Sequence, residues 1–494
     1  MDLLDVGVCE IAKRIRSREV SAVEVVDAHI ARIEAVNPAI NAMIATRFDA
    51  ARTEAVAADQ RIGSEAPDDL PDLIGVPCSV KEFVGVQGMP HTAGLSRQRN
   101  KVATEDATAV ARLRAAGCIV LGMGNVPDGG IWMETYNPIY GWTNNPWDSA
   151  RTPGGSSGGE AAIVSAGGVP FGLGADIGGS IRIPSACCGT VGHKPTGGTI
   201  PNTGVHAPSG ALCGRYHTVG PIARRVADLM PLVKIMAGPD GRCPSTDARL
   251  LGDPSTVRIE DLVVHVADGN GRAWVSSDVK AGVWRAAKAL EERGAQIRPL
   301  RSPHLTAAFE IWAAMLADGN DESYAEVLAC GQPFSYPAEL AKMLMRRGDI
   351  SSPALVIGML ADLLDKLPGQ QDALVQQGLT ARAELEQIMG DDGVLLTPTF
   401  PVTAPVHREL LLRPFAATFV QLFNVLEFPA TVVPSGFDHR GLPTSVQLVG
   451  RRGDDHRTIA AAAAVEDGLG GWTRIDPRPG RLRDAIKQRL WGTS

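Results

Sequence analysis

The amino-acid sequence predicts an α/β fold built as one large domain. Short apolar runs alternate with amphipathic helical stretches, which is the order expected when helices return the chain to buried strands. The 494-residue chain is 44% hydrophobic and only 5% aromatic, and its 54 glycines and 34 prolines are typical of a loop-rich globular enzyme. Neither an internal repeat nor a low-complexity linker divides the sequence, so we expect a single domain over residues 1–494.

The first helix with clear boundaries follows from its capping residues. Ser21-Ala-Val-Glu24 has the pattern of a capping box, in which the hydroxyl and the carboxylate satisfy free backbone amides at a helix start. Apolar residues then fall on one helical face, and Asn37-Pro38 is expected to end the helix.

The next elements form a strand–helix–strand unit. Val76–Val80 predicts a buried strand that carries Lys81 at its carboxyl end. A helix is expected from Asp106 to Gly117, and Cys118–Leu121 predicts the following strand. Because active groups of open α/β sheets lie at the carboxyl ends of strands, Lys81 is a candidate site residue.

The remaining elements are less regular. Residues 154–198 are rich in glycine, serine and other small side chains, without a clear period. Beyond them we expect an amphipathic helix after Gly220-Pro221 that ends near Gly238-Pro239, a strand at Leu262–Val266, a helix capped by Ser277 and ended by Gly294, helices through 305–390, and strands at Gly393–Leu396 and Ser445–Val449.

Composition excludes several classes of function. The net charge is -7 and no basic run occurs, so we expect no nucleic-acid partner. The eight cysteines lack CxxC spacing and are expected to be reduced, without a metal site. The N-terminus lacks a signal-peptide pattern, and no apolar run approaches the ~18–20 residues of a membrane helix. We therefore expect a cytoplasmic protein without a membrane anchor.

The glycine-rich region contains three patterns that suggest other chemistry. Gly154-Gly-Ser-Ser-Gly158 satisfies G-x-S-x-G, but the preceding residues do not predict the strand that a hydrolase elbow requires. Gly172-Leu-Gly174 suggests a dinucleotide loop, yet the third glycine falls one residue late, at Gly178. A P-loop sequence does not occur, and we expect no cofactor.

The same region can supply the chemistry that amide cleavage requires. An amide is a poor electrophile, so its hydrolysis needs an activated nucleophile and preorganised donors for the developing oxyanion. Ile177-Gly-Gly-Ser180 could place a hydroxyl beside a nest of backbone N–H groups. A lysine can serve as the base only if burial holds it uncharged, and Lys81 at the end of an apolar strand is placed for that role.

These segments resemble the amidase signature family. Residues 154–185 fit the family's motif in register, and Gly75-Val-Pro-Cys-Ser-Val-Lys-Glu82 is similar to its lysine segment. The resemblance covers most of the chain and is weakest over about 240–390. It implies a mixed, twisted β-sheet covered on both faces by helices, with a signature core over about 70–240 and a variable, substrate-shaping helical segment over about 300–390.

The resemblance also implies roles for individual residues. Ser180 would be the nucleophile, and Ser156, preceded by a cis peptide bond, would relay its proton to uncharged Lys81. Backbone amides of the nucleophile turn would form the oxyanion hole. The residues implied at this turn are Ile177, Gly178, Gly179 and Ser180 for the oxyanion hole, and Ser157, Asp176 and Arg182 as supporting residues.

Several details resemble fatty-acid amide hydrolases and acylamidases more closely than other branches, among them Glu160 and the segment Asn137–Pro146. This implies a small-molecule amide substrate with a hydrophobic or aryl acyl group, and leaves a homodimer as the candidate assembly. Three alternatives stay open: the A subunit of a glutamine-dependent tRNA amidotransferase, a urethane or oligoamide hydrolase, and a non-catalytic binding protein. The scattered histidines, including His91, His193 and His217, are assigned no chemistry.

Overall fold

The computed structural model describes residues 2–206, 212–248, 251–319, 322–345, 347–364 and 371–480. Its helices are α1 Val8–Arg16, α2 Ala22–Ile40, α3 Phe48–Ser64, α4 Thr108–Ala115, α5 Gly158–Ser165, α6 Arg182–Cys188, α7 Cys213–Tyr216, α8 Leu229–Met236, α9 Ser277–Glu291, α10 Pro303–Thr306, α11 Ala308–Gly319, α12 Tyr324–Ala329, α13 Tyr336–Leu344, α14 Ser352–Leu364, α15 Gln371–Met389, α16 Thr418–Val425 and α17 Asp455–Leu469. Its strands are β1 Met43–Thr46, β2 Pro77–Lys81, β3 Ile119–Gly124, β4 Tyr136–Asn137, β5 Gly141–Trp142, β6 Phe171–Asp176, β7 Val191–Lys194, β8 Thr218–Ala223, β9 Val263–Val266, β10 Gln296–Pro299, β11 Gly393–Pro398, β12 Ala430–Phe437 and β13 Pro443–Val449.

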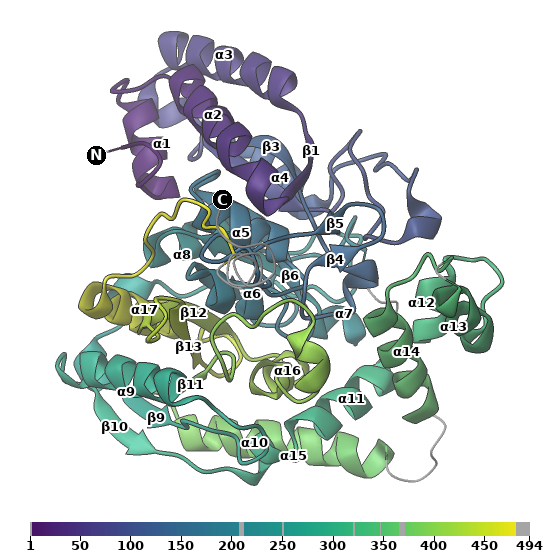
Figure 1. Ribbon diagram of the computed structural model, residues 1–494. Helices are drawn as coiled ribbons and strands as arrows, with labels where there is room; N and C mark the ends of the chain where they lie inside the picture. The colour runs from purple at the N-terminus through teal and green to yellow at the C-terminus, as the bar shows by residue number, and fades with distance from the viewer. Residues whose placement is uncertain are drawn as a thin grey trace, which may run out of the picture.

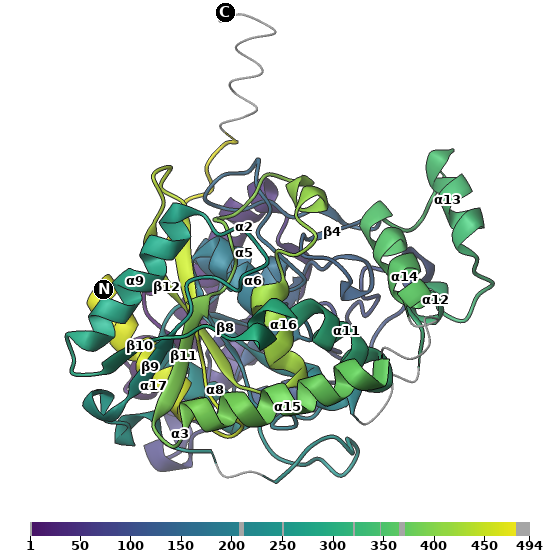
Figure 2. The ribbon, with the colours of Figure 1, turned by 90° about the horizontal axis from the view of Figure 1, so that it is seen from below.

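One large mixed sheet forms the centre of the molecule. Eleven strands lie in the order β1-β3-β2-β6-β8-β7-β12-β13-β11-β9-β10, and both parallel and antiparallel neighbours occur. Helices cover the sheet on both sides (Figure 1). Figure 2 shows α9 and α17 on one side of β12, with α5, α6 and α16 on the other. The expected α/β fold, with a mixed sheet between helices, is confirmed.

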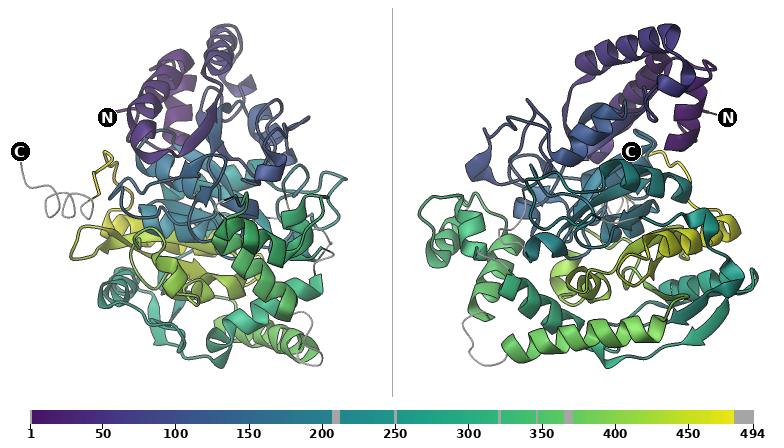
Figure 3. Two further views of the ribbon diagram at one scale, coloured as in Figure 1. Left: turned by 45° about the vertical axis from the view of Figure 1, so that its right-hand side comes forward. Right: turned by 180° about the vertical axis from the view of Figure 1, so that it is seen from behind.

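The sheet has two halves that meet at one seam. One half of the sheet contains β1, β3, β2, β6, β8 and β7, which all come from residues before 224. The other half contains β12, β13, β11, β9 and β10, which come from residues after 262. The halves are joined by β7 and β12, which pair antiparallel over three residue pairs, from Gly192 with Val432 to Lys194 with Ala430. The views of Figure 3 show the N-terminal helices and the long helix α15 at opposite ends of the molecule.

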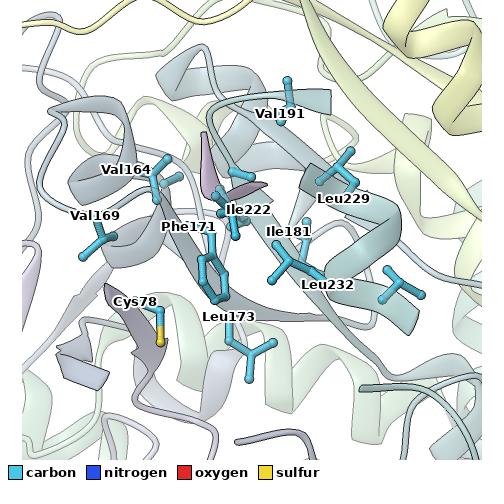
Figure 4. Close-up of a cluster of buried hydrophobic side chains, with 14 of the residues drawn as sticks. Cys78, Val164, Val169, Phe171, Leu173, Ile181, Val191, Ile222, Leu229 and Leu232 are labelled. Atoms are coloured by element: carbon cyan, nitrogen blue, oxygen red, sulfur yellow. The ribbon is translucent and has the colours of Figure 1, made fainter. Parts of the chain in front are cut away.

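The core of the first half surrounds β6 and β8. Phe171 and Leu173 on β6 pack with Ile222 on β8 and with Leu229 and Leu232 of α8, all fully buried (Figure 4). Burial on both faces explains why these strands lack the alternating polar pattern that would have revealed them in the sequence.

Several element boundaries differ from those expected. The capping box at Ser21 is confirmed, but α2 continues past Asn37-Pro38 to Ile40. Proline has no N–H to donate to the carbonyl four residues earlier, so α2 lacks that hydrogen bond at Pro38 and still continues for two residues. The N-cap of α9 is Ser276 rather than Ser277, with its side chain accepting a hydrogen bond from Val279 N.

The structure also places the patterns from the glycine-rich region. Gly172-Leu-Gly174 lies inside strand β6, so it is no dinucleotide loop. Ser156 follows a loop rather than a strand, which excludes the hydrolase elbow at this serine. Gly220-Pro221, expected to precede a helix, lies within strand β8, and the helix itself begins at Leu229.

Among the described residues, no helix combines the length and the apolar character that crossing a bilayer requires.

Candidate active site

The candidate site lies where two neighbouring parallel strands end. Lys81 is the last residue of β2, and Asp176 is the last residue of β6, which pairs with β2 in parallel. Parallel strands bring their carboxyl ends to the same edge, so the lysine and the loop after β6 meet there. Ser156 comes from the loop before α5, which packs on β2, β3 and β6.

Lys81 is buried and bonded to the first serine. Its Nζ lies 2.8 Å from Ser156 Oγ and donates to Ala175 O at 3.1 Å. The side chain is 1% exposed. Burial lowers the pKa of Lys81 to about 7, although the charge of Asp176 and, when it is ionised, that of Glu160 act in the opposite direction. An uncharged amine at this position can accept the hydroxyl proton of Ser156.

A cis peptide bond joins Gly155 to Ser156, as the resemblance implies. The next residue, Ser157, donates its backbone N–H to Ser180 O at 3.0 Å and thereby links this loop to the loop that carries Ser180. The Ser157 hydroxyl lies 3.3 Å from Ala175 O, beside the Lys81 contact. The two loops are thus linked through a backbone hydrogen bond.

The turn after β6 is organised by Asp176. Its carboxylate accepts from the backbone amides of Gly179 at 2.7 Å and Ile181 at 3.0 Å, and from Arg182 Nε and Nη2 at 3.0 Å each. Burial alone would raise the pKa of Asp176, but the Arg182 guanidinium and the hydrogen bonds hold that pKa below its usual range. Asp176 and Arg182 thus lie together at the turn that carries Ser180.

The backbone amides of the turn are not equivalent. The Gly179 N–H is engaged by Asp176, so in this conformation it does not face a substrate. The amides of Ile177, Gly178 and Ser180 have no acceptor among the described residues. Of the amides expected in the oxyanion hole, the Gly179 amide is thus bonded within the turn, and those of Ile177, Gly178 and Ser180 stay candidates.

Three residues around the turn were not expected from the sequence. Asn424 of α16 donates to Asp176 O and Oδ1 and accepts from Arg182 at 2.5 Å, while Gln447 of β13 accepts from the same arginine at 3.2 Å. Trp312 of α11 donates its indole N–H to Ile177 O at 3.0 Å. A lone asparagine within the apolar run of α16 was the one available signal, because a buried amide requires partners.

Glu160 lies next to the lysine and is fully buried. A side chain at Gly124 would overlap its carboxyl group, and a Cβ at Gly172 would lie 3.0 Å from its Cβ and Cγ. Burial raises the pKa of Glu160 to about 8, so the carboxyl is largely protonated near neutral pH. The two strand glycines thus make room for this acid beside Lys81.

The three histidines named from the sequence form no hydrogen bond with Lys81, Ser156 or Ser180 among the described residues. His193 bonds Thr431 at 2.9 Å and Asp455 at 3.1 Å inside the core. His217 and His91 belong to an aromatic group with Phe83 and His206. Burial lowers the pKa of His217 to about 3, aided by the nearby Lys81, so this ring is uncharged.

Comparisons with known proteins agree with this geometry. A sequence profile of the Amidase family matches residues 24–459. Fatty-acid amide hydrolase 2-A of Danio rerio is 37% identical, over 95% of this chain and 90% of its own length, and an acylamidase of Rhodococcus erythropolis is 33% identical over 92% and 94%. The A subunit of the glutamyl-tRNA(Gln) amidotransferase of Roseiflexus sp. is 32% identical over 93% and 96%.

Solved structures give the same result. A 6-aminohexanoate cyclic dimer hydrolase superposes with a TM-score of 0.80 and 27% identity, covering 97% of this chain and 99% of the other. A bacterial aryl acylamidase superposes with a TM-score of 0.76 and 26% identity, over 94% and 96%. From the profile match along most of its length, its relatives and the lysine–serine geometry, we conclude that the chain belongs to the amidase signature family.

Proposed function

We propose that this amidase cleaves carboxylic amides through an acyl-enzyme on Ser180, with Ser156 and Lys81 as the proton relay. The observation that carries the proposal is the buried Lys81 amine, whose pKa is lowered to about 7 and whose Nζ lies 2.8 Å from Ser156 Oγ. A lysine that is uncharged near neutral pH can act as a general base, whereas a surface lysine cannot.

In the first half-reaction, Lys81 Nζ takes the proton of Ser156 Oγ as Ser156 takes the proton of Ser180 Oγ. Ser180 Oγ bonds to the substrate carbonyl carbon, and the carbonyl oxygen becomes an oxyanion held by the amides of Ile177, Gly178 and Ser180. The C–N bond then breaks as the relay returns the proton to the leaving amine.

In the second half-reaction, water takes the place of the amine. The relay removes a proton from the water, whose oxygen bonds to the acyl carbon, and the Ser180 ester bond breaks as its oxygen regains a proton. The products are a carboxylic acid and the free enzyme, and no cofactor takes part in any step.

We propose a hydrophobic or aryl acyl group for the substrate. Trp312, from the segment expected to shape the substrate site, lies against Gly178 at the reaction centre. The fatty-acid amide hydrolase and acylamidase relatives support the same class. The A subunit of a tRNA amidotransferase is the second candidate, because relatives of that name match nearly the whole chain at 31–32% identity.

The test uses the purified chain alone with p-nitroanilides of graded acyl length. We expect turnover, burst kinetics, and labelling of Ser180 by a fluorophosphonate. Ser180→Ala should lose activity while its circular dichroism and thermal unfolding stay unchanged. Activity that requires glutamine and an added partner protein would instead favour the amidotransferase reading, and activity retained by Ser180→Ala would refute the nucleophile.

Cytoplasmic location and a homodimeric assembly are part of the same proposal. Light scattering of the purified chain and fractionation of the cells that produce it are the measurements that decide them.

A further inference from the structure

Helix α16 packs against the loop of residues 176–180, which carries the proposed nucleophile. Three residues of the helix contact this loop. Val420 packs against Gly179, where an added Cβ would overlap the valine side chain. Asn424, one turn further on, donates to Asp176. Gln421 lies between these contacts in the helical order, and its Cγ is 3.7 Å from the position that a Cβ of Gly178 would take.

The side-chain oxygen of Gln421 lacks the hydrogen bond that the neighbouring buried amides of Asn424 and Gln447 form. Both ends of the Asn424 and Gln447 side-chain amides form hydrogen bonds, to Arg182 on the oxygen side and to protein oxygens on the nitrogen side. Gln421 is 8% exposed, and its Oε1 is buried without a partner among the described residues. Since a buried acceptor without a donor costs free energy, such an atom beside a reaction centre suggests a ligand that supplies the donor.

Trp312 packs on the same glycine as Gln421. Its indole N–H is held by Ile177 O, and its six-membered ring lies 3.3 Å from the missing Cβ of Gly178. The indole and the Gln421 side chain therefore flank one glycine of the nucleophile turn. Because Gly178 has no side chain, both groups pack close to its backbone, next to the amide that the proposed function assigns to the oxyanion.

We propose that Gln421 is a specificity-determining residue that accepts a hydrogen bond from a hydroxyl or amino group on the acyl part of the substrate, while Trp312 contacts its apolar part. This inference rests on the proposed function and names the substrate class of the same site. The hydroxyl or amino group of the substrate would lie one or two bonds from the scissile carbonyl. Gln421 packs on Gly178, whose amide is one of the proposed oxyanion donors, so the two groups of the enzyme are close together. A pure hydrocarbon acyl group would leave Oε1 without a partner and be hydrolysed more slowly.

The experiment compares matched substrates that differ by one hydroxyl group. The p-nitroanilides of each 2-hydroxy-2-phenylacetic acid enantiomer are measured against phenylacetyl p-nitroanilide, and those of 3-hydroxy-3-phenylpropanoic acid against 3-phenylpropanoyl p-nitroanilide. For one hydroxylated substrate, we expect the wild-type kcat/KM to exceed that of its partner by roughly 10-fold or more, since a site built to bond a hydroxyl rejects the analogue that lacks it.

Two variants distinguish a loss of selectivity for the hydroxyl group, expected for Gln421, from an equal loss of kcat/KM for both substrates of a pair. Gln421→Met keeps the length of the side chain and removes the acceptor, and the kcat/KM ratio should fall to about 1–2. Trp312→Phe keeps an aromatic ring but loses the bond to Ile177 O, and should lower kcat/KM for both partners of a pair without changing their ratio. Because Gln421→Met removes an unsatisfied buried atom, its thermal midpoint should equal or exceed that of the wild type.

A wild-type ratio near 1 for every pair overturns the inference, and so does a ratio that Gln421→Met leaves unchanged. If Gln421→Met fails to fold, Gln421→Leu takes its place and the wild-type ratio stands as an independent test. Hydrolysis of none of the anilides, together with no labelling of Ser180 by fluorophosphonate, overturns the proposed function itself and the inference with it.

Discussion

Two buried lysines lie near the reaction centre, and only one of them contacts a proposed relay residue. Lys81 is 2.8 Å from Ser156, whereas Lys194 donates to Pro195 O at 3.0 Å. Burial lowers the pKa of both to about 7. The pair therefore offers a matched comparison between a base and a lysine that is merely buried.

Activity should rise with pH as Lys81 loses its proton. Below a pKa of about 7 the amine is charged and cannot accept a proton, so kcat/KM for an anilide should fall about tenfold per pH unit. Above that pKa the base is free and kcat/KM should reach a plateau. Lys81→Ala should lose activity, and Lys194→Met, if it folds, should keep the wild-type rise. A profile flat between about pH 5 and 10 would contradict the lysine base.

Arg182 compensates the charge of Asp176 and has no exposed surface. In Arg182→Met the carboxylate would stay buried without its cation, which costs about 3–5 kcal/mol of unfolding free energy. Urea denaturation followed by circular dichroism measures this loss. Arg258→Met is the control, because the Arg258–Glu260 pair is largely exposed and should be dispensable. A loss in Arg182→Met no larger than in the control would show that the turn does not depend on the ion pair.

At the scale of elements, short-range signals predicted boundaries well where side chains act locally. The capping box of α2 is formed as expected, with Glu24 N bonded to Ser21 Oγ at 3.1 Å and Ser21 N bonded to Glu24 Oε2 at 2.8 Å. Strand β2 ends at Lys81, as the apolar run before it indicates. Strands β6, β7 and β8 were missed, because glycines and full burial remove the period of two on which strand prediction depends.

The contribution of the α2 cap can be measured directly. Ser21→Ala removes the acceptor for Glu24 N and should lower the free energy of unfolding by about 0.5–2 kcal/mol. Thermal and urea denaturation measure the change. Ser64→Ala is the control, because the Ser64 hydroxyl bonds only to carbonyls of its own helix at an exposed position. Equal stability of the two variants would mean that tertiary packing alone fixes the start of α2.

At the scale of the whole molecule, the sequence predicted the α/β class and indicated Lys81, Ser156 and Ser180 as candidate site residues. It did not predict which distant segments contact the turn after β6. Asn424 and Gln447 reach Arg182 from more than 240 positions away, and Trp312 reaches Ile177 from a segment whose similarity to the family is weakest. Such contacts depend on strand order, which a local pattern does not encode.

The seam between β7 and β12 has a consequence for how the enzyme can be divided. The N-terminal half of the sheet carries the proposed base, relay and nucleophile, and the C-terminal half carries the amides of Asn424 and Gln447 that hold Arg182. If the chain is cut near residue 245, in the loop that connects the halves, neither fragment should hydrolyse an anilide. Co-expressed fragments should reassemble across the seam and regain activity, which would show that the two halves recognise each other without a covalent link.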